Sequence, residues 1–281
     1  MLTTLKTMNP DRMTHPQLHS YDLSPMVTAF STMRQGGVGE GSYASFNINN
    51  YCGDSADAIA ENTARLCRHL AISRRQLVFP HQTHSASVLC IDDDFMQLGY
   101  DARAARLEGI DALVTDLSGV CIGVSTADCI PILIFDTANH VVAAVHAGWR
   151  GTVARIVEAT LGTMAECYGT RAADCKAVVG PGISLHRFEV GDEVYDAFRD
   201  AGFNMQYISR AFPVDESVES RGWKWHLDLP ECNGMQLRNM GVAPENIHMA
   251  GICTYDNVDR FFSARRLGID SGRIFTGIMM K

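Results

Sequence analysis

The stretch GVCIGVSTADCIPILIFDTANHVVAAV (residues 119–145) contains three apolar runs that are rich in β-branched residues. The runs are Gly119–Thr126, Ile130–Phe135 and Val141–Val145, and short turns separate them. β-Branched residues favour strands, and strands that stay apolar instead of alternating are typical of a sheet buried on both faces. The sequence therefore predicts that these runs form a buried central sheet.

Strands and helices alternate on both sides of this stretch. The predicted strands are Met26–Phe30, Ala86–Ile91, Ala112–Thr115, Ala177–Val179 and Ile247–Ala250, and the predicted helices are Ala56–Leu70, Val153–Glu166, Asp192–Arg199 and Leu229–Met240. Because the strands occur both as neighbouring hairpins and as strand–helix–strand units, the sheets should be mixed. No Gly/Ser-rich or Pro-rich linker interrupts residues 26–281, which we predict to be a single α/β (α+β) catalytic domain.

The first 25 residues differ from the rest of the chain. They are rich in Pro, His and Thr, and their apolar residues follow neither a helical nor a strand period. Such segments are typical of loosely held termini. The sequence predicts a flexible N-terminal extension over residues 1–25.

The composition restricts the class of partner. A net charge of −8 at pH 7 argues against a nucleic-acid polymer, whereas a small anionic substrate is compatible with a locally basic pocket. The nine cysteines are scattered and form no Cys-x-x-Cys pair, which favours a reducing compartment. No segment has the pattern of a signal peptide or a membrane span. We therefore predict a cytoplasmic protein with no membrane partner.

Three segments place reactive side chains next to predicted strands: PHQTHS (residues 80–85), STADCIP (residues 125–131) and VHAGWRGT (residues 145–152). They contain His84, Cys129 and His146. Imidazole and thiolate are the preferred ligands of Zn²⁺ and copper, and three protein ligands leave a fourth position open for catalysis. The spacing follows no short metal motif, so a packed Cys129 with two histidines bonded to loop carbonyls is an equal alternative.

The VHAGWRGT segment has the composition of an anion pocket. Gly148 and Gly151 permit close approach of the backbone, Thr152 is placed to cap the next helix, and Arg150 adds positive charge. The alternative is a tight turn with a packed Trp149. We expect an anion to bind beside the metal.

Other polar residues near these segments are candidates for supporting roles. Asp111 or Asp128 could orient a ligating histidine through its second ring nitrogen, or each could be a turn carboxylate. Near the C-terminus, Arg265 and Arg266 follow two phenylalanines and could bind phosphate in a bidentate manner. The alternative for this segment is a solvated helix end that packs its phenylalanines into the core.

Together these segments resemble one family, the YfiH/YlmD-type proteins that have long been labelled multicopper polyphenol oxidoreductases (laccases). The resemblance covers nearly all of the chain after the N-terminal extension. The stretches that carry it are RQGGV (34–38), QTH (82–84), DALVT (111–115), TADCIP (126–131), AVHAGWRGT (144–152), GPGI (180–183) and FSARR (262–266), together with Asn47.

The resemblance implies a site, a fold and an activity. The metal ligands and catalytic residues fall on His84, Cys129 and His146, with one Zn²⁺ per chain and Cu²⁺ as a possible substitute; His81 is a rival for His84. We expect substrate and phosphate to contact Arg34, Asn47, Asp128, Arg150, Arg265 and Arg266. The implied fold is a layered sandwich of mixed β-sheets flanked by helices. The implied activity is phosphorolysis of adenosine, inosine, guanosine and S-methyl-5′-thioadenosine, with deamination of adenosine.

Three other functions are open at the level of the sequence. A metal-free amidase or deamidase would use Cys129 as nucleophile, His146 as base, and GPG (180–182) or helix amides as the oxyanion hole. A copper-dependent polyphenol oxidase is disfavoured, because the ten histidines include no His-x-His pair for a copper cluster. A scaffolding protein is disfavoured by the charged residues inside glycine-rich turns. The preferred nucleoside and the oligomeric state are not predicted.

Overall fold

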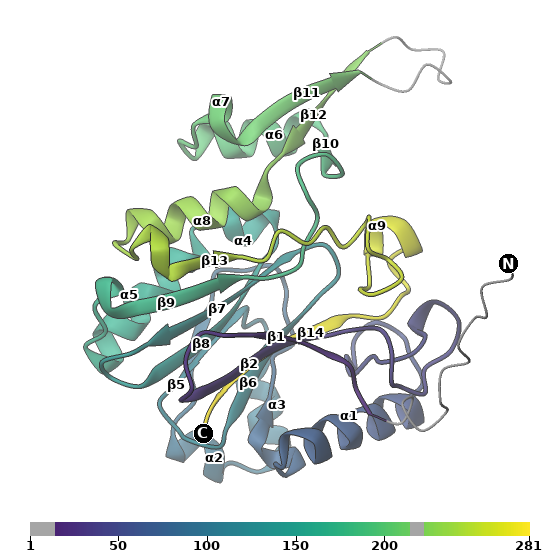
Figure 1. Ribbon diagram of the computed structural model, residues 1–281, viewed down its shortest axis with the longest axis vertical. Coiled ribbons are helices and arrows are strands. Elements are labelled where there is room, and N and C mark those ends of the chain that lie inside the picture. Colours follow the sequence, from purple (N-terminus) through teal and green to yellow (C-terminus); the bar gives the residue numbers. More distant parts are fainter. Residues whose placement is uncertain (1–14, 214–221) are drawn as a thin grey trace, which may run out of the picture.

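Two mixed β-sheets packed face to face form the centre of the protein (Figure 1). The computed structural model describes residues 15–213 and 222–281. The five-stranded sheet has the order β1 (Leu18–Tyr21), β2 (Val27–Thr32), β14 (Ile274–Met280), β6 (Cys121–Thr126) and β3 (Leu77–Val78). The six-stranded sheet has the order β13 (Ile247–Met249), β9 (Cys175–Val179), β7 (Ile130–Asp136), β8 (Val141–Ala147), β5 (Ala112–Thr115) and β4 (Val88–Cys90). Each sheet contains both parallel and antiparallel pairs, as predicted.

Helices cover the outer faces of both sheets. The helices are α1 (Ala56–Leu70), α2 (Asp93–Gln97), α3 (Tyr100–Leu107), α4 (Trp149–Val153), α5 (Ile156–Tyr168), α6 (Asp192–Asp200), α7 (Met205–Ile208), α8 (Leu229–Asn239) and α9 (Ala264–Leu267). Helix α1 packs Leu66 against the outer face of the five-stranded sheet, and α5 and α8 pack on the six-stranded sheet. The layered α+β sandwich that the resemblance implied is confirmed. No helix in the described part of the chain is long and apolar enough to cross a membrane.

The three central runs do not share one sheet, contrary to the prediction. Strand β6 belongs to the five-stranded sheet, whereas β7 and β8 pair with each other in the six-stranded sheet. Val124 of β6 and Leu133 of β7 meet in the core between the sheets. Every residue of the three strands is buried, because each sheet is covered on both faces. The residues 127–129 cross from one sheet to the other, and this crossing positions Cys129.

Two strands of the five-stranded sheet, the edge strand β1 and the central strand β14, also depart from the prediction. Residues 15–25 are not a loose extension, because β1 pairs with β2 and buries Tyr21 and Leu23. The expectation for residues 1–14 lies outside the described residues. The C-terminal strand β14, which the sequence analysis did not include, lies between β2 and β6. The two ends of the chain therefore complete the same sheet.

A small three-stranded sheet projects from one end of the sandwich, at the top of Figure 1. It has the order β10 (Glu189–Val190), β12 (Trp223–Leu227) and β11 (Ser209–Pro213). The helix predicted over Val153–Glu166 corresponds to α5, which begins at Ile156. The short helix α4 precedes it, and Arg155 in the left-handed conformation (φ 62°) separates the two. Thr152 is buried inside α4 and is not its cap; the capping position is Gly148.

Candidate metal centre

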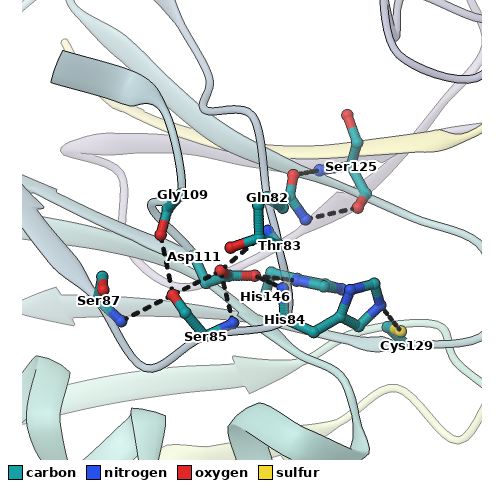
Figure 2. Close-up of polar contacts among 10 residues, drawn as sticks. All are labelled: Gln82, Thr83, His84, Ser85, Ser87, Gly109, Asp111, Ser125, Cys129 and His146. Atoms are coloured by element: carbon teal, nitrogen blue, oxygen red, sulfur yellow. Dashed lines mark hydrogen bonds and ion pairs between the residues drawn. The ribbon is translucent and has the colours of Figure 1, made fainter. Parts of the chain in front are cut away.

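His84, Cys129 and His146 meet at one end of the two sheets (Figure 2). His146 lies in β8, Cys129 immediately precedes β7, and His84 lies in the loop after β3. The β7–β8 register pairs Pro131 with His146, so Cys129 is held next to the histidine by main-chain hydrogen bonds. One ligand atom from each of the three side chains lies within 4.8 Å of the other two. Residues far apart in the sequence are thus brought into a single cluster.

The distance between two of the ligand atoms is close to that in a tetrahedral metal site. Cys129 Sγ lies 3.8 Å from His84 Nε2. Zinc bonds of about 2.3 Å to sulfur and about 2.0–2.1 Å to nitrogen place two tetrahedral ligand atoms about 3.6 Å apart. The Cys129–His84 pair would therefore need only a small adjustment to hold the ion, and the three ligand atoms together lie within 4.8 Å of one another. Three protein ligands would leave one coordination position for substrate or water.

Asp111 organises the cluster from behind. Its side chain is fully buried, and Oδ1 accepts a hydrogen bond from His146 Nδ1 at 2.6 Å. A carboxylate only accepts, so Nδ1 carries the proton and Nε2 is the nitrogen left for a metal. The same carboxylate accepts the backbone N–H groups of Thr83, His84 and Ser85. The positive φ of His84 (63°) lets these successive N–H groups converge on one anion.

The electrostatics of the cluster favour the thiolate of Cys129 and the carboxylate of Asp111. Burial would lower the pKa of His146, but Cys129 and Asp111 raise that pKa to about 9, so a metal ion would have to displace a proton from His146 Nε2. Burial alone would raise the pKa of the Cys129 thiol, but the positive charge of His146 and hydrogen bonds from both histidines lower that pKa to about 6. Burial would likewise raise the pKa of Asp111, and the hydrogen bonds from His146 and Ser85 lower it instead. Cys129 is therefore a thiolate and Asp111 a carboxylate at neutral pH. Thiolate is the form in which cysteine binds metals.

The backbone at Gly148 closes one side of the cluster. A Cβ atom at this position would lie 2.6 Å from His84 Cδ2 and 3.2 Å from Cys129 Sγ. No side chain fits there while His84 keeps its position. Gly148, which was predicted from the sequence to allow close approach of the backbone, therefore lies directly against the ligands.

Substituting Gly148 by alanine should displace the exposed His84 ring and weaken metal binding by about tenfold or more, with zinc as the probe ion, since ligands must be held to within about 0.5 Å. The thermal midpoint should change little, because the ring can swing into solvent. Gly162→Ala is the control, as nothing lies within 4 Å of its added Cβ. Competition with a chromogenic zinc chelator measures the affinity; equal zinc affinity in Gly148→Ala and the wild type would contradict this packing argument.

The cluster opens into a cavity of about 240 Å³, whose lining includes all three ligands. The lining also includes Tyr51, half exposed at 54%, and His81, whose ring stacks on Tyr51 with centroids 3.8 Å apart and an interplanar angle of 18°. His81 Nδ1 contacts the Glu108 carboxylate at 2.8 Å. His81 is thus engaged by Tyr51 and Glu108, and the ligand cluster contains His84, not His81.

The arginines that were predicted from the sequence to contact the substrate do not line the metal-site cavity. Arg34 donates to the carbonyls of Ala44 and Val258, Arg150 lies over the Trp149 ring, and Arg266 donates to the Tyr255 carbonyl. The cavity lining contains none of these three arginines. Arg265 lines a neighbouring cavity, which shares the wall residues Ala264 and Ile269 with the metal-site cavity.

Asp128 and Asn47 have supporting positions. Asp128 accepts hydrogen bonds from Thr254 Oγ1 and from the Arg265 N–H, so it ties the crossing loop to the C-terminal segment and not to a histidine. Of the two carboxylates considered as orienting groups, Asp111 has that role. Asn47 is fully buried and accepts the N–H groups of Asn49 and Arg273, both of which line the cavity.

Several lining residues were not identified from the sequence. They include Tyr51, Ser125, Thr126 and Arg273. Arg273 immediately precedes β14, a strand that was not predicted from the sequence. The position of Arg273 near residues 126–129 was therefore not predicted either. The SGR stretch at residues 271–273 was a detectable cue, because an arginine that precedes an apolar run can lie at the end of a strand.

The fold and the site define a two-sheet α+β protein with a cysteine–histidine metal-type centre. The chain belongs to the family described as multi-copper polyphenol oxidoreductase laccase, whose model matches residues 28–281. A Bacteroides thetaiotaomicron protein named purine nucleoside phosphorylase is 46% identical over 254 residues, covering 90% of this chain and 92% of its own. Adenosine deaminase RL5, from an unknown prokaryotic organism, is 43% identical, covering 91% and 94%. The crystal structure of Bacillus licheniformis hypothetical protein YfiH has a TM-score of 0.81 and 26% identity, covering 91% and 93%.

Proposed function

We propose that this protein is a zinc-dependent purine nucleoside phosphorylase that also deaminates adenosine. The proposed substrates are phosphate with adenosine, inosine, guanosine or S-methyl-5′-thioadenosine. The observation that carries the proposal is the Asp111-oriented cluster of His84, Cys129 and His146 in the wall of a small cavity. The names of the two curated relatives support the same chemistry. The nine cysteines, all free, favour the cytoplasm as its compartment.

The residues of the cavity have separate tasks in this proposal. The two histidines and Cys129 hold the ion, which would supply Lewis-acid activation of water or of a substrate atom when bound. Tyr51, buttressed by His81, offers an aromatic face on which a purine can stack. Asp111 accepts the hydrogen bond from His146 Nδ1, which keeps a proton on that nitrogen and leaves Nε2 for the ion. Arg265, in the neighbouring cavity, is a candidate for contacts with the part of the substrate that extends beyond Ala264.

The proposal is tested by following adenine release from adenosine with and without phosphate. We expect adenine and a ribose 1-phosphate only when phosphate is present, whereas inosine should form in either buffer. Chromatography of the products distinguishes the two reactions. Phosphate-independent release of adenine would show a hydrolase instead.

Substituting Tyr51 by alanine should raise the KM for adenosine by about five- to tenfold, because base–aromatic stacking contributes about 1–3 kcal/mol. Tyr51→Phe keeps the ring and is the matched control. The turnover number should change less than KM, since Tyr51 is not a ligand. Steady-state kinetics at saturating phosphate measure both constants, and equal KM values in the alanine variant and the wild type would contradict the stacking role.

A metal-free thiol hydrolase is the second candidate, and the acidity of Cys129 favours it. The pKa of Cys129 near 6, together with the hydrogen bond from His146 to Asp111, matches the nucleophile–base–orienting-group arrangement of thiol enzymes. Such an enzyme keeps full activity after dialysis against a chelator and loses it when Cys129 is alkylated. The zinc enzyme loses activity on dialysis and regains it with added zinc.

The described part of the chain has too few metal ligands for the copper oxidase named in the family description. A four-electron oxidase needs several coppers, each held mainly by histidine. Within residues 15–213 and 222–281, His84, Cys129 and His146 are the one group of three or more potential ligands. This set can hold one ion, so the ligand count favours single-metal chemistry.

A further inference from the structure

Arg273 is a cation at the wall of the metal-site cavity. Among the described residues that line this cavity, it is the one arginine or lysine. Its Nη1 donates to the carbonyls of Ser271 and Gly272, and its Nη2 donates to the carbonyl of Ile269 at 2.9 Å. No carboxylate of the described residues lies within 4.0 Å of its guanidinium. Neutral carbonyls hold the side chain in place but leave its charge uncompensated.

The backbone of Arg273 is fixed independently of its side chain. Its N–H donates to Oδ1 of the fully buried Asn47 at 3.1 Å. The same oxygen accepts the N–H of Asn49, a second lining residue. Asn47 is held in turn by Asp54, which accepts its Nδ2 at 2.9 Å. The guanidinium is therefore preorganised, which lowers the entropic cost of binding an anion.

Two buried hydroxyl groups lie at the end of strand β6, and that of Ser125 is on the same face of the sheet as Arg273. The β14–β6 register pairs Ile274 with Thr126 and Phe275 with Ser125, so Arg273 adjoins the end of β6. Both residues line the cavity and are almost fully buried, with exposed fractions of 6% for Ser125 and 1% for Thr126. Neither hydroxyl oxygen has a hydrogen-bond partner among the described residues. Buried polar groups without partners are rare in proteins, and a bound ligand is one explanation for them.

The strand end that carries these hydroxyls is itself rigid. The Gln82 side chain donates to the Ser125 carbonyl at 2.8 Å and accepts the Ser125 N–H at 2.7 Å (Figure 2). Cys129 follows Thr126 by one short turn, and His84 follows Gln82 by two residues. An anion bound between Arg273 and the Ser125 hydroxyl would therefore lie in the same cavity as the metal ligands.

We propose that Arg273, with the hydroxyl of Ser125, binds the phosphate that attacks the nucleoside. This assignment rests on the proposed phosphorolysis. Guanidinium groups bind phosphate oxygens through charge-assisted hydrogen bonds, and hydroxyl groups add neutral donors. In the reaction, a phosphate oxygen forms a bond to C1′ and the bond from C1′ to N9 breaks. The purine leaves with the electron pair of that bond and gains the proton that hydrogen phosphate gives up.

Arg273→Gln tests the assignment, with Arg260→Gln as the matched control. Arg260 lies over the Phe261 ring and does not line the cavity. We expect the KM for phosphate to rise by about 10- to 100-fold in Arg273→Gln, the usual effect of losing a charge-assisted hydrogen bond. Arg260→Gln should keep the wild-type KM values for both phosphate and adenosine, because Arg260 lies outside the cavity. Arg273→Lys should recover part of the phosphate affinity.

Two measurements separate failure of this assignment from failure of the proposed function. If the wild type is a phosphorylase and Arg273→Gln has the wild-type KM for phosphate, Arg273 is not the phosphate ligand. If the wild type releases no adenine with phosphate, the proposed function fails. Calorimetry of inorganic phosphate with the zinc-loaded protein then tests the anion site directly. Binding that is lost in Arg273→Gln supports the site, and equal binding by the variant and the wild type overturns it.

Discussion

Substituting Cys129 by alanine should abolish nucleoside cleavage and deamination, leaving less than about 1% of the wild-type rate, because a two-histidine set binds zinc weakly. The thermal midpoint of the metal-free protein should shift by less than about 2 °C, since Cys129 is half-buried at a cavity wall and its removal leaves no enclosed void. Activity assays and calorimetric melting on the same preparation measure both effects.

Cys253→Ala is the control for the Cys129 experiment. Cys253 is also half-buried, but it lies outside the lining of the metal-site cavity. Its substitution should preserve zinc content and activity. A drop of many degrees in the melting temperature of Cys129→Ala, together with retained activity, would identify Cys129 as a packing residue and contradict the metal site.

Substituting Asp111 by asparagine should have the second-largest effect. The carboxylate accepts five hydrogen bonds, which come from the Thr83, His84 and Ser85 N–H groups, Ser85 Oγ and His146 Nδ1. An asparagine NH₂ group would face at least two of these donors, so the free energy of unfolding should fall by about 2–4 kcal/mol. Zinc affinity should fall by about 10- to 100-fold, because His146 loses its orienting partner.

The control for Asp111→Asn is Asp136→Asn. Asp136 is also fully buried, and it accepts hydrogen bonds from Ala138, Asn139 and the Asn139 side chain at the far end of β7. Both variants should lose stability in denaturant titrations, but only Asp111→Asn should lose zinc. If the two variants retain zinc equally well, Asp111 does not act through the metal centre.

The sequence predicted the elements of the sandwich better than their pairing. The helix at Ala56–Leu70 and the strand at Ala112–Thr115 have the predicted bounds, because strong periodicity or β-branching marks them. The assignment of β6 to a different sheet from β7 and β8 was not predictable, since burial on both faces is the same in either sheet. Strand β1 was not predicted because it lies in a mostly polar segment, and only its last residue, Tyr21, is buried.

Residue types marked the three segments that carry the ligands, and the family resemblance selected His84 over His81, but the supporting residues were not predictable. His84, Cys129 and His146 were selected because each lies next to a predicted strand, and the structure brings them together. Choosing Asp111 over Asp128 as the orienting carboxylate requires the β5–β8 pairing, which places Ala112 opposite Val145. Arg273 requires the β14–β6 register. Long-range strand pairing therefore places Asp111 and Arg273 at the site, and the local sequence does not reveal that pairing.

The zinc content of the purified protein tests the central claim most directly. Elemental analysis after dialysis against chelator-free buffer should give one zinc per chain in the wild type and close to none in a variant with both His84→Ala and Cys129→Ala. Adenine release in the presence of phosphate should rise in proportion to the zinc bound. A wild-type protein that contains no zinc, binds none when zinc is added, and still cleaves adenosine at its full rate would contradict the account.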